Sequence, residues 1–284
     1  MIGRRGAAAF LAVPPYLWLG LLFVLPMVVV VAVSLQPGSG RINFGPGWPG
    51  TAQYGQIADT PVYLRQLGLS VAMAFGVAVT ATILAFPLAY FLAFRAREHA
   101  GTFLILLLLP FATSFLLRIM AWKLLLGHDG AINWLLTTLG IVDQPSTLLI
   151  YSRAAVILTL IYVWIPFAAL PIYAALQRID RSHLEAAADL GAGPWTRFFR
   201  VTVPLSLPGV LATMFMVFIP TVGEYVTPVL VGGPDGVMYG QLVQDFFTRA
   251  GNWPLGSALA VVMLVTTLAL VALATRVIDF RRLV

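Results

Sequence analysis

Long apolar runs separated by short polar intervals make up most of the chain. Six of these runs are long enough to cross a bilayer, because about 20 apolar residues in a helix span its hydrocarbon core. They cover roughly residues 14–35, 68–94, 102–126, 154–176, 205–230 and 255–277. The pattern predicts an all-α integral membrane protein with six transmembrane helices, in which residues 1–284 form a single transmembrane domain.

The longest polar interval in the second half of the chain covers residues 178–204. Its sequence predicts a short helix whose N-cap is either Ser182, in a capping box with Glu185, or Asp180. On this local pattern alone, a solvated loop between two membrane helices is the simplest interpretation.

The same interval also carries signals for the end of that helix. Gly191 or Gly193 suits a left-handed C-terminal position, and Pro194 prevents the helix from continuing. A second amphipathic turn is expected after the proline, with Trp195 and Phe199 among its aromatic residues.

Three other polar intervals follow the first, third and fifth apolar runs. They cover residues 36–67, 127–153 and 231–254. The second of them contains an apolar piece at 131–139 that predicts a short interfacial helix. In the third, Asn252 is a suitable N-cap for the last membrane helix.

The basic residues predict the orientation in the membrane. With the N-terminus inside, 11 of the 17 lysines and arginines lie in the inner segments: Arg4, Arg5, Arg95, Arg97, Arg178, Arg181, Arg197, Arg200, Arg276, Arg281 and Arg282. Cytoplasmic segments of membrane proteins carry such an excess, so we expect both termini and residues 178–204 in the cytoplasm.

Composition fits a membrane protein and argues against other classes. The chain is 60% hydrophobic and 10% charged, whereas average soluble domains have about 25% charged residues. The formal charge is +6, but the arginines gather at the ends of apolar runs, which argues against a nucleic-acid partner. The first ten residues look like the start of a signal peptide, yet the run to Leu35 is too long for one, so we expect an uncleaved first span.

Motifs for catalysis, nucleotide binding and metal binding are absent from the sequence. The only lysine, Lys123, is outside any phosphate-binding loop, so ATP would have to be bound by another chain. His99, His128 and His183 lie in separate loops, and with no cysteine a metal site is not expected. We therefore expect neither an enzyme nor a bound cofactor.

One acid stands inside an apolar run that proline and glycine interrupt. A carboxylate at the bilayer centre costs about 2.5–3.5 kcal/mol, so Glu224 is expected to face a cavity or a partner, unless its segment has already left the membrane. Tyr225, Trp164 and Tyr162 are candidates for cation–π contact with an organic cation on the same path. Arg118 is a second intramembrane charge, which either lines the path or snorkels to the outer interface.

The order of residues within 178–204 resembles the EAA loop of ABC-importer permeases. The matching elements are a Glu-Ala-Ala triplet, a later glycine and an aliphatic-x-aliphatic-Pro end: Glu185, Ala186, Ala187, Gly191, Val201, Val203 and Pro204. In that family the loop is a cytoplasmic coupling helix that docks into a groove on the ATPase subunit. The resemblance implies the same coupling role here, although Arg181 stands where the family usually has proline and leaves the start of the helix undecided.

Further stretches look like the PotB-type permeases of spermidine/putrescine importers: residues 109–122, 173–195, 201–212, 223–234 and 252–262. This resemblance implies a type I ABC importer permease (MetI-like) fold in the bacterial inner membrane. It also implies a second related permease, two ATPase subunits, a periplasmic binding protein and a polyamine substrate.

Other functions stay open at this point. Related permeases with the same loop move ferric iron, thiamine or phosphonates. A channel or scaffold protein would need no ATPase partner, but it leaves the ordered motif unexplained. A membrane enzyme lacks any set of catalytic residues.

Overall fold

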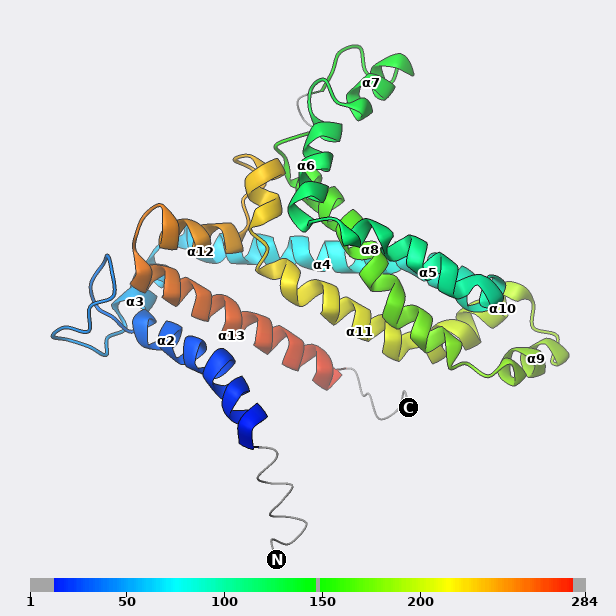
Figure 1. Cartoon of the computed structure of the whole chain (residues 1–284), viewed down its shortest axis with the longest axis horizontal. Coiled ribbons are helices and arrows are strands. Elements are labelled where there is room, and N and C mark those ends of the chain that lie inside the picture. Colours follow the sequence, from blue (N-terminus) through cyan, green and yellow to red (C-terminus); the bar gives the residue numbers. More distant parts are fainter. Residues whose placement is uncertain (1–12, 147–148, 278–284) are drawn as a thin grey trace, which may run out of the picture. The chain divides into compact units, whose positions relative to one another are not determined.

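The computed structural model of the chain describes residues 13–146 and 149–277, and Figure 1 shows it as a ribbon. Over these residues the regular structure is entirely helical. Arg4, Arg5, Arg281 and Arg282, and most of the stretch that looks like a signal peptide, lie outside them.

Five helices in the described part are long and apolar enough to cross a membrane: Val13–Ser34, Pro61–Arg95, Arg153–Gln177, Pro194–Val222 and Trp253–Arg276. A sixth span is reached when one bent pair of helices counts as a single crossing. Many large apolar side chains on these helices are exposed, Phe23 and Leu273 among them, as expected for a surface that faces lipid.

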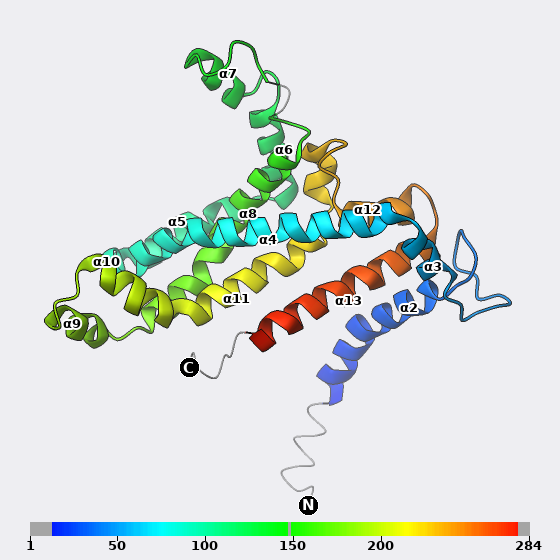
Figure 2. The same ribbon diagram turned by 180° about the vertical axis from the view of Figure 1, so that it is seen from behind.

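The third apolar run differs from the prediction of one helix over 102–126. The chain forms two helices, Arg97–Ala112 and Phe115–Thr138, which are bent by 84° against each other. Thr113 and Ser114 have extended ψ angles of 154° and 140°, and this backbone stops the helical hydrogen bonding between the two pieces. Figure 2 shows α6 (Phe115–Leu126) and α7 (Ala131–Thr138) turning away from α5 (Ala100–Leu108). The predicted short helix at 131–139 is confirmed as α7.

The fifth run is also divided. Helix α11 (Val203–Val222) continues through Pro208 and Pro220 but ends at Gly223, so the predicted run 205–230 is not one helix. A short helical stretch that includes η6 (Pro228–Gly232) follows. Then α12 (Tyr239–Thr248) lies where the sequence predicted only a polar interval.

The chain separates into two compact units. The first contains the described residues up to Leu64 together with Leu242–Thr266, and the second contains Arg65–Gln241 and the chain from Thr267 onward. Helices α4 (Pro61–Tyr90), α12 and α13 (Trp253–Val277) each run from one unit into the other.

Side-chain bonds to the backbone hold the first unit together after α2 (Leu25–Ser34). The Gln53 side chain, on α3 (Ala52–Asp59), donates to the carbonyls of Gln36 and Gly38 at 3.1 and 2.9 Å. A backbone bond adds to these, because the Trp253 main-chain N–H donates to the Gly40 carbonyl at 2.9 Å, where α13 begins. Asn252 accepts from the Leu255 N–H at 3.3 Å and is the predicted cap of that helix.

The second unit is built around the pair α8 (Arg153–Gln177) and α11, which lie side by side (Figure 1). At their closest approach, a Cβ added to Gly209 would lie 2.4 Å from the Ala175 Cβ and 2.8 Å from the Pro171 carbonyl oxygen. Thr213 donates from its hydroxyl to the Ala168 carbonyl at 3.2 Å. Only glycine permits this contact, because any side chain at position 209 would force the helices apart.

Candidate functional site

The helix predicted within 178–204 is α9 (Arg181–Asp189), and Asp180 is its N-cap. The Asp180 carboxylate accepts from the Ser182 N–H at 3.0 Å, which lowers the pKa of Asp180 from its ordinary value. Ser182 lies in the first turn, so the alternative of a capping box between Ser182 and Glu185 is wrong.

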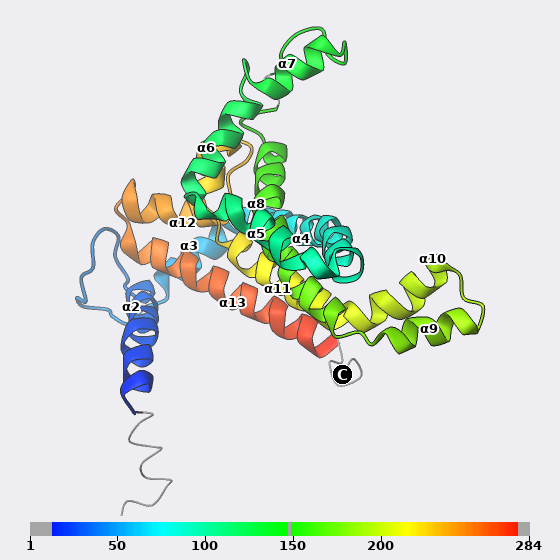
Figure 3. The ribbon, with the colours of Figure 1, turned by 45° about the vertical axis from the view of Figure 1, so that its right-hand side comes forward.

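Gly191 provides the left-handed end of α9, with φ of +78°. The Gly191 N–H donates to the Ala188 carbonyl at 2.8 Å and the Ala192 N–H donates to the Ala187 carbonyl at 3.0 Å, which is the Schellman arrangement. Pro194 then starts α10 (Pro194–Arg197), and Figure 3 shows α9 and α10 together beyond the ends of α8 and α11.

The surface of this α9–α10 hairpin (Arg181–Arg197) is open. No residue of α9 is buried: Glu185, Ala186 and Gly191 are exposed, Ala187 is half-buried, and Pro204 beyond the hairpin is exposed. Apolar side chains near its end are also exposed, with Leu190 at 89% and Trp195 at 75%. Small and apolar side chains on a polar segment form the kind of surface that a partner protein covers.

Aromatic contacts fasten the base of the hairpin to α4 within the second unit. The Phe198 ring lies 5.6 Å from the Phe86 ring and 5.7 Å from the Tyr90 ring, both edge-to-face, and both partners belong to α4. Phe199 stacks with Trp195 at 6.1 Å. Such pairs contribute about 0.5–1.5 kcal/mol each beyond their buried area, so they stabilise the contact between the hairpin base and α4.

Glu224 is half-buried at the break after α11. Its Oε1 accepts from the backbone N–H groups of Val226 and Thr227 at 2.9 and 3.0 Å. The carboxylate therefore satisfies the first free donors of the next helical stretch. Tyr225 beside it is 46% exposed.

The other two aromatic candidates have partners on different elements. Tyr162, which is 40% exposed, packs edge-to-face with Trp122 of α6 at 5.3 Å. Trp164 lies 5.9 Å from Phe167 on its own helix. Neither ring has a described contact with Glu224, so the structure divides the predicted path residues into two groups.

Arg118 lies in the aromatic cluster that contains Trp164 and Phe167, and its guanidinium packs against two aromatic rings. The guanidinium lies 4.1 Å from the centre of the Phe111 ring and 5.8 Å from that of Phe115, and Phe111 packs against Phe167 at 4.4 Å. The side chain bridges the bend at Thr113–Ser114, because Phe111 precedes the bend and Arg118 follows it. The Arg118 Nε and Nη1 atoms are buried and have no hydrogen-bond partner, and the two rings are the described contacts of its guanidinium.

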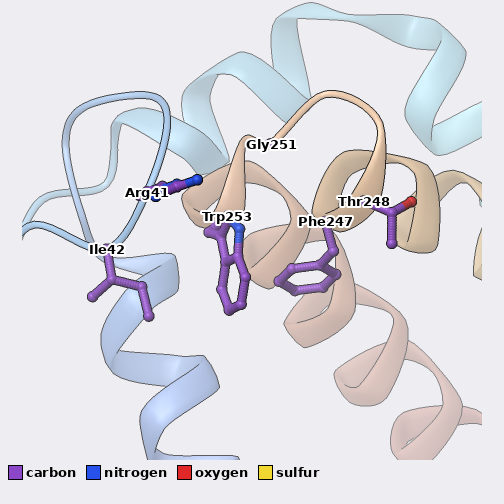
Figure 4. A pocket seen from close by; sticks show the side chains of 6 residues that line it. All are labelled: Arg41, Ile42, Phe247, Thr248, Gly251 and Trp253. Atoms are coloured by element: carbon purple, nitrogen blue, oxygen red, sulfur yellow. The ribbon is translucent and has the colours of Figure 1, made fainter.

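A groove of about 530 Å³ lies on the first unit, outside all the predicted site residues. Figure 4 shows its lining: Arg41, Ile42, Phe247, Thr248, Gly251 and Trp253. Phe247 and Trp253 pack edge-to-face at 5.6 Å. Within residues 13–146 and 149–277, no group of His, Cys, Asp and Glu side chains could hold a metal ion.

Helix α12 carries polar residues that sequence reasoning missed. Gln241, Gln244, Asp245 and Thr248 follow one another at the spacing i, i+3, i+4, i+7, which places them on one face of a helix. That spacing was the available signal, but Gly232-Gly233-Pro234 and Asn252-Trp253-Pro254 around the segment favoured a loop.

The family described as "Binding-protein-dependent transport system inner membrane component" matches residues 2–283. The chain belongs to this family. The spermidine/putrescine transport system permease protein PotB of Haemophilus influenzae is 33% identical to it over 244 residues, which are 86% of this chain and 84% of PotB.

Solved structures share the fold of the chain. A chain in the crystal structure of a bacterial alginate ABC transporter in complex with alginate pentasaccharide-bound periplasmic protein superposes with a TM-score of 0.71 at 17% identity, over 97% of this chain and 94% of that one. A chain of the MetNI methionine ABC transporter gives a TM-score of 0.55 at 16% identity, over 75% of this chain and 93% of that one. The predicted all-α, MetI-like permease fold is confirmed.

The chain is thus a permease component of a binding-protein-dependent importer in the inner membrane. Residues 178–204, which resemble the coupling loop of such permeases, form a capped, exposed helix followed by a tight turn.

Proposed function

We propose that this permease forms, with a second related permease, the path by which polyamines such as spermidine and putrescine enter the cell. A periplasmic binding protein delivers the substrate and two separate ATPase subunits supply the energy. The observation that carries the substrate class is the 33% identity to PotB over 86% of the chain.

Coupling to the ATPase is assigned to α9. Glu185, Ala186, Ala187 and Gly191 lie on or beside an exposed helix. Small side chains let a helix sit deep in a groove of the partner, and the exposed Glu185 pairs with a basic rim. Pro204 follows the hairpin and starts the return into the membrane.

The substrate path is assigned to the broken segment after α11. Glu224 presents a carboxylate at partial burial, and a cationic amine compensates such a charge as it passes. Tyr225 beside it supplies an exposed ring for cation–π contact. Tyr162 and Trp164 also line the path, in the aromatic cluster where the Arg118 guanidinium packs against Phe111.

Orientation follows from the arginine distribution, with both termini in the cytoplasm and α9 on the cytoplasmic side. This places the coupling hairpin where an ATPase can reach it.

The test is uptake by the complete transporter, with both permeases, the ATPases and the binding protein reconstituted in liposomes. Labelled spermidine and putrescine are expected to enter with ATP inside the compartment that holds the ATPase, and not with a non-hydrolysable analogue. ATP-dependent uptake of ferric iron, thiamine or a phosphonate with no uptake of amines would overturn the substrate class and keep the importer.

A further inference from the structure

A pocket lined by three arginines lies where two membrane helices end. Its volume is about 600 Å³, and Arg97, Arg178 and Arg181 are among its lining residues, while Phe94 and Leu176 add an apolar wall. All of its lining residues belong to the second unit, so the pocket lies within one compact part of the chain. Pockets that bind small molecules have volumes of about 300–1,000 Å³, so this space suits a compact ligand.

The charge of this arginine pocket is positive and unpaired. Asp180 is the only acid among its described lining residues, and the Asp180 carboxylate accepts from the Ser182 N–H. Glu98 is exposed and does not line the pocket. Within residues 13–146 and 149–277 the ion pairs are formed by other side chains. An anion that enters the pocket therefore meets three guanidinium groups that no acid of the described chain neutralises.

Helix electrostatics accounts for Arg178 but not for Arg181. Arg178 is the C-cap of α8, where a cation is favourable because the C-terminus of a helix carries a partial negative charge. Arg181 is the first residue of α9, and the partial positive charge of a helix N-terminus disfavours a cation there. A bound anion would offset this repulsion, so it explains a charge that the helix alone does not favour.

The pocket lies at the depth of the lipid headgroups. The apolar spans Pro61–Arg95 and Arg153–Gln177 end two residues before Arg97 and one residue before Arg178. Two helical residues rise by about 3 Å, whereas the headgroup layer is about 5–8 Å thick on each side of the hydrocarbon core. An acidic side chain of the ATPase would have to reach into this layer, so a lipid is the better occupant.

We propose that the arginine pocket binds the phosphodiester headgroup of an anionic phospholipid. Guanidinium groups bind phosphate through paired N–H donors, and basic pockets between transmembrane helices on the cytoplasmic side bind anionic headgroups. The proposed orientation places this end of the helices on that side. The headgroup joins Arg97, after η2 (Phe91–Arg95), to Arg178 and Arg181 at the start of α9. The site goes beyond the proposed function, because its binding involves neither the substrate nor the ATPase.

Lipid binding is tested on the purified complete transporter by native mass spectrometry, with phosphatidylglycerol and phosphatidylcholine as the probes. We expect the unmodified transporter to retain phosphatidylglycerol in preference to phosphatidylcholine. Arg97→Gln and Arg178→Gln each remove one cation, and each should weaken phosphatidylglycerol binding about fivefold, the loss expected for one basic residue beside an anionic lipid surface. Arg178→Lys keeps the charge but loses the paired donors, so its affinity should fall between those of Arg178→Gln and the unmodified protein.

Arg95→Gln is the matched control, because it removes the same charge from an exposed side chain that does not line the pocket, two residues before Arg97. It should bind phosphatidylglycerol as the unmodified transporter does. An equal loss in Arg95→Gln and Arg97→Gln would overturn the site and leave only general attraction to an anionic surface.

Two further results would assign the pocket to another ligand and overturn the proposal. One is displacement of phosphatidylglycerol by inorganic phosphate, which would indicate a site for the free anion. The other is loss of the ATPase from Arg178→Gln with unchanged lipid binding, which would indicate an acidic contact on that subunit. The measurement needs no substrate and no intact membrane, so failure of amine uptake or of the proposed orientation would leave its result unaffected.

Discussion

At the scale of single residues, the Glu224 carboxylate is an observed helix cap, and the proposed function adds contact with the substrate's ammonium group. Oε1 accepts two backbone N–H bonds, and losing such a cap typically costs about 0.5–2 kcal/mol. The negative charge is a separate property, which the cap does not need. Substitutions that keep one property and remove the other can therefore separate the two functions.

Glu224→Gln keeps an acceptor oxygen and removes the charge, whereas Glu224→Ala removes both. We expect both variants to lower polyamine uptake, and only Glu224→Ala to lower the thermal unfolding midpoint of the purified complex, consistent with a loss of about 1 kcal/mol. Asp235→Asn, at an exposed loop acid, serves as the control. Full uptake by Glu224→Gln would reduce Glu224 to a helix cap.

The sequence marked Glu224 because a charge inside an apolar run is conspicuous. Its capping bonds were beyond prediction, because they depend on α11 ending at Gly223 and on a new helical stretch starting at Val226. The N-cap of α9 was easier to predict, because the sequence showed both candidates, Asp180 and Ser182, and only the choice between them was open. Arg118 stayed undecided because its ring partner Phe111 lies across a bend that the sequence did not reveal.

At the scale of elements, α9 depends on how it ends. Gly191 has φ of +78°, and a left-handed conformation costs a residue with a side chain roughly 1–2 kcal/mol. No atom lies within 4 Å of a Cβ built on Gly191. The cost of a substitution within this chain is thus backbone strain and not a clash.

Gly191→Ala should loosen the end of α9 and uncouple ATP hydrolysis from uptake, or release the ATPase during purification. Gly193→Ala is the matched control: it makes the same change two residues later, where φ is −66° and the space around the Cβ is also empty. The readouts are the ratio of ATP hydrolysed to substrate imported and the amount of ATPase that copurifies. Equal behaviour of the two variants would mean that the α9–α10 hairpin is only a linker.

Uninterrupted apolar runs were the elements best predicted from sequence, because length and composition alone define them. The run 154–176 lies within α8 even though two prolines occur inside it. The break at Thr113–Ser114 was not foreseen, since neither residue is a strong helix breaker. Helix α12 was missed because its polar face suited a solvent-exposed loop equally well.

At the scale of the whole molecule, the arginine pattern predicts which side of the membrane each loop faces. Reporter fusions after Arg97 and after Arg200 should give a cytoplasmic signal, and a fusion near Gly47 should give a periplasmic one. The reporters are phosphatase and fluorescent protein fusions at each site, which give opposite signals on the two sides. A periplasmic signal after Arg200 would contradict the coupling role of α9.

The contact at Gly209 has a mechanical consequence. The Gly209 backbone of α11 packs there directly against Ala175 and the Pro171 carbonyl of α8, and α9 and α10 join the two helices at one end. Two helices in direct contact and connected at one end are expected to move together, so a displacement of α9 would shift α8 and α11 along their length. At the far end α11 gives way to Glu224 and η6, and Gly232 of η6 lies against Val156 of α8. With the ATPase contact proposed for α9 and the substrate contact proposed for Glu224, a displacement by the ATPase would reach the substrate as a joint movement of α8 and α11.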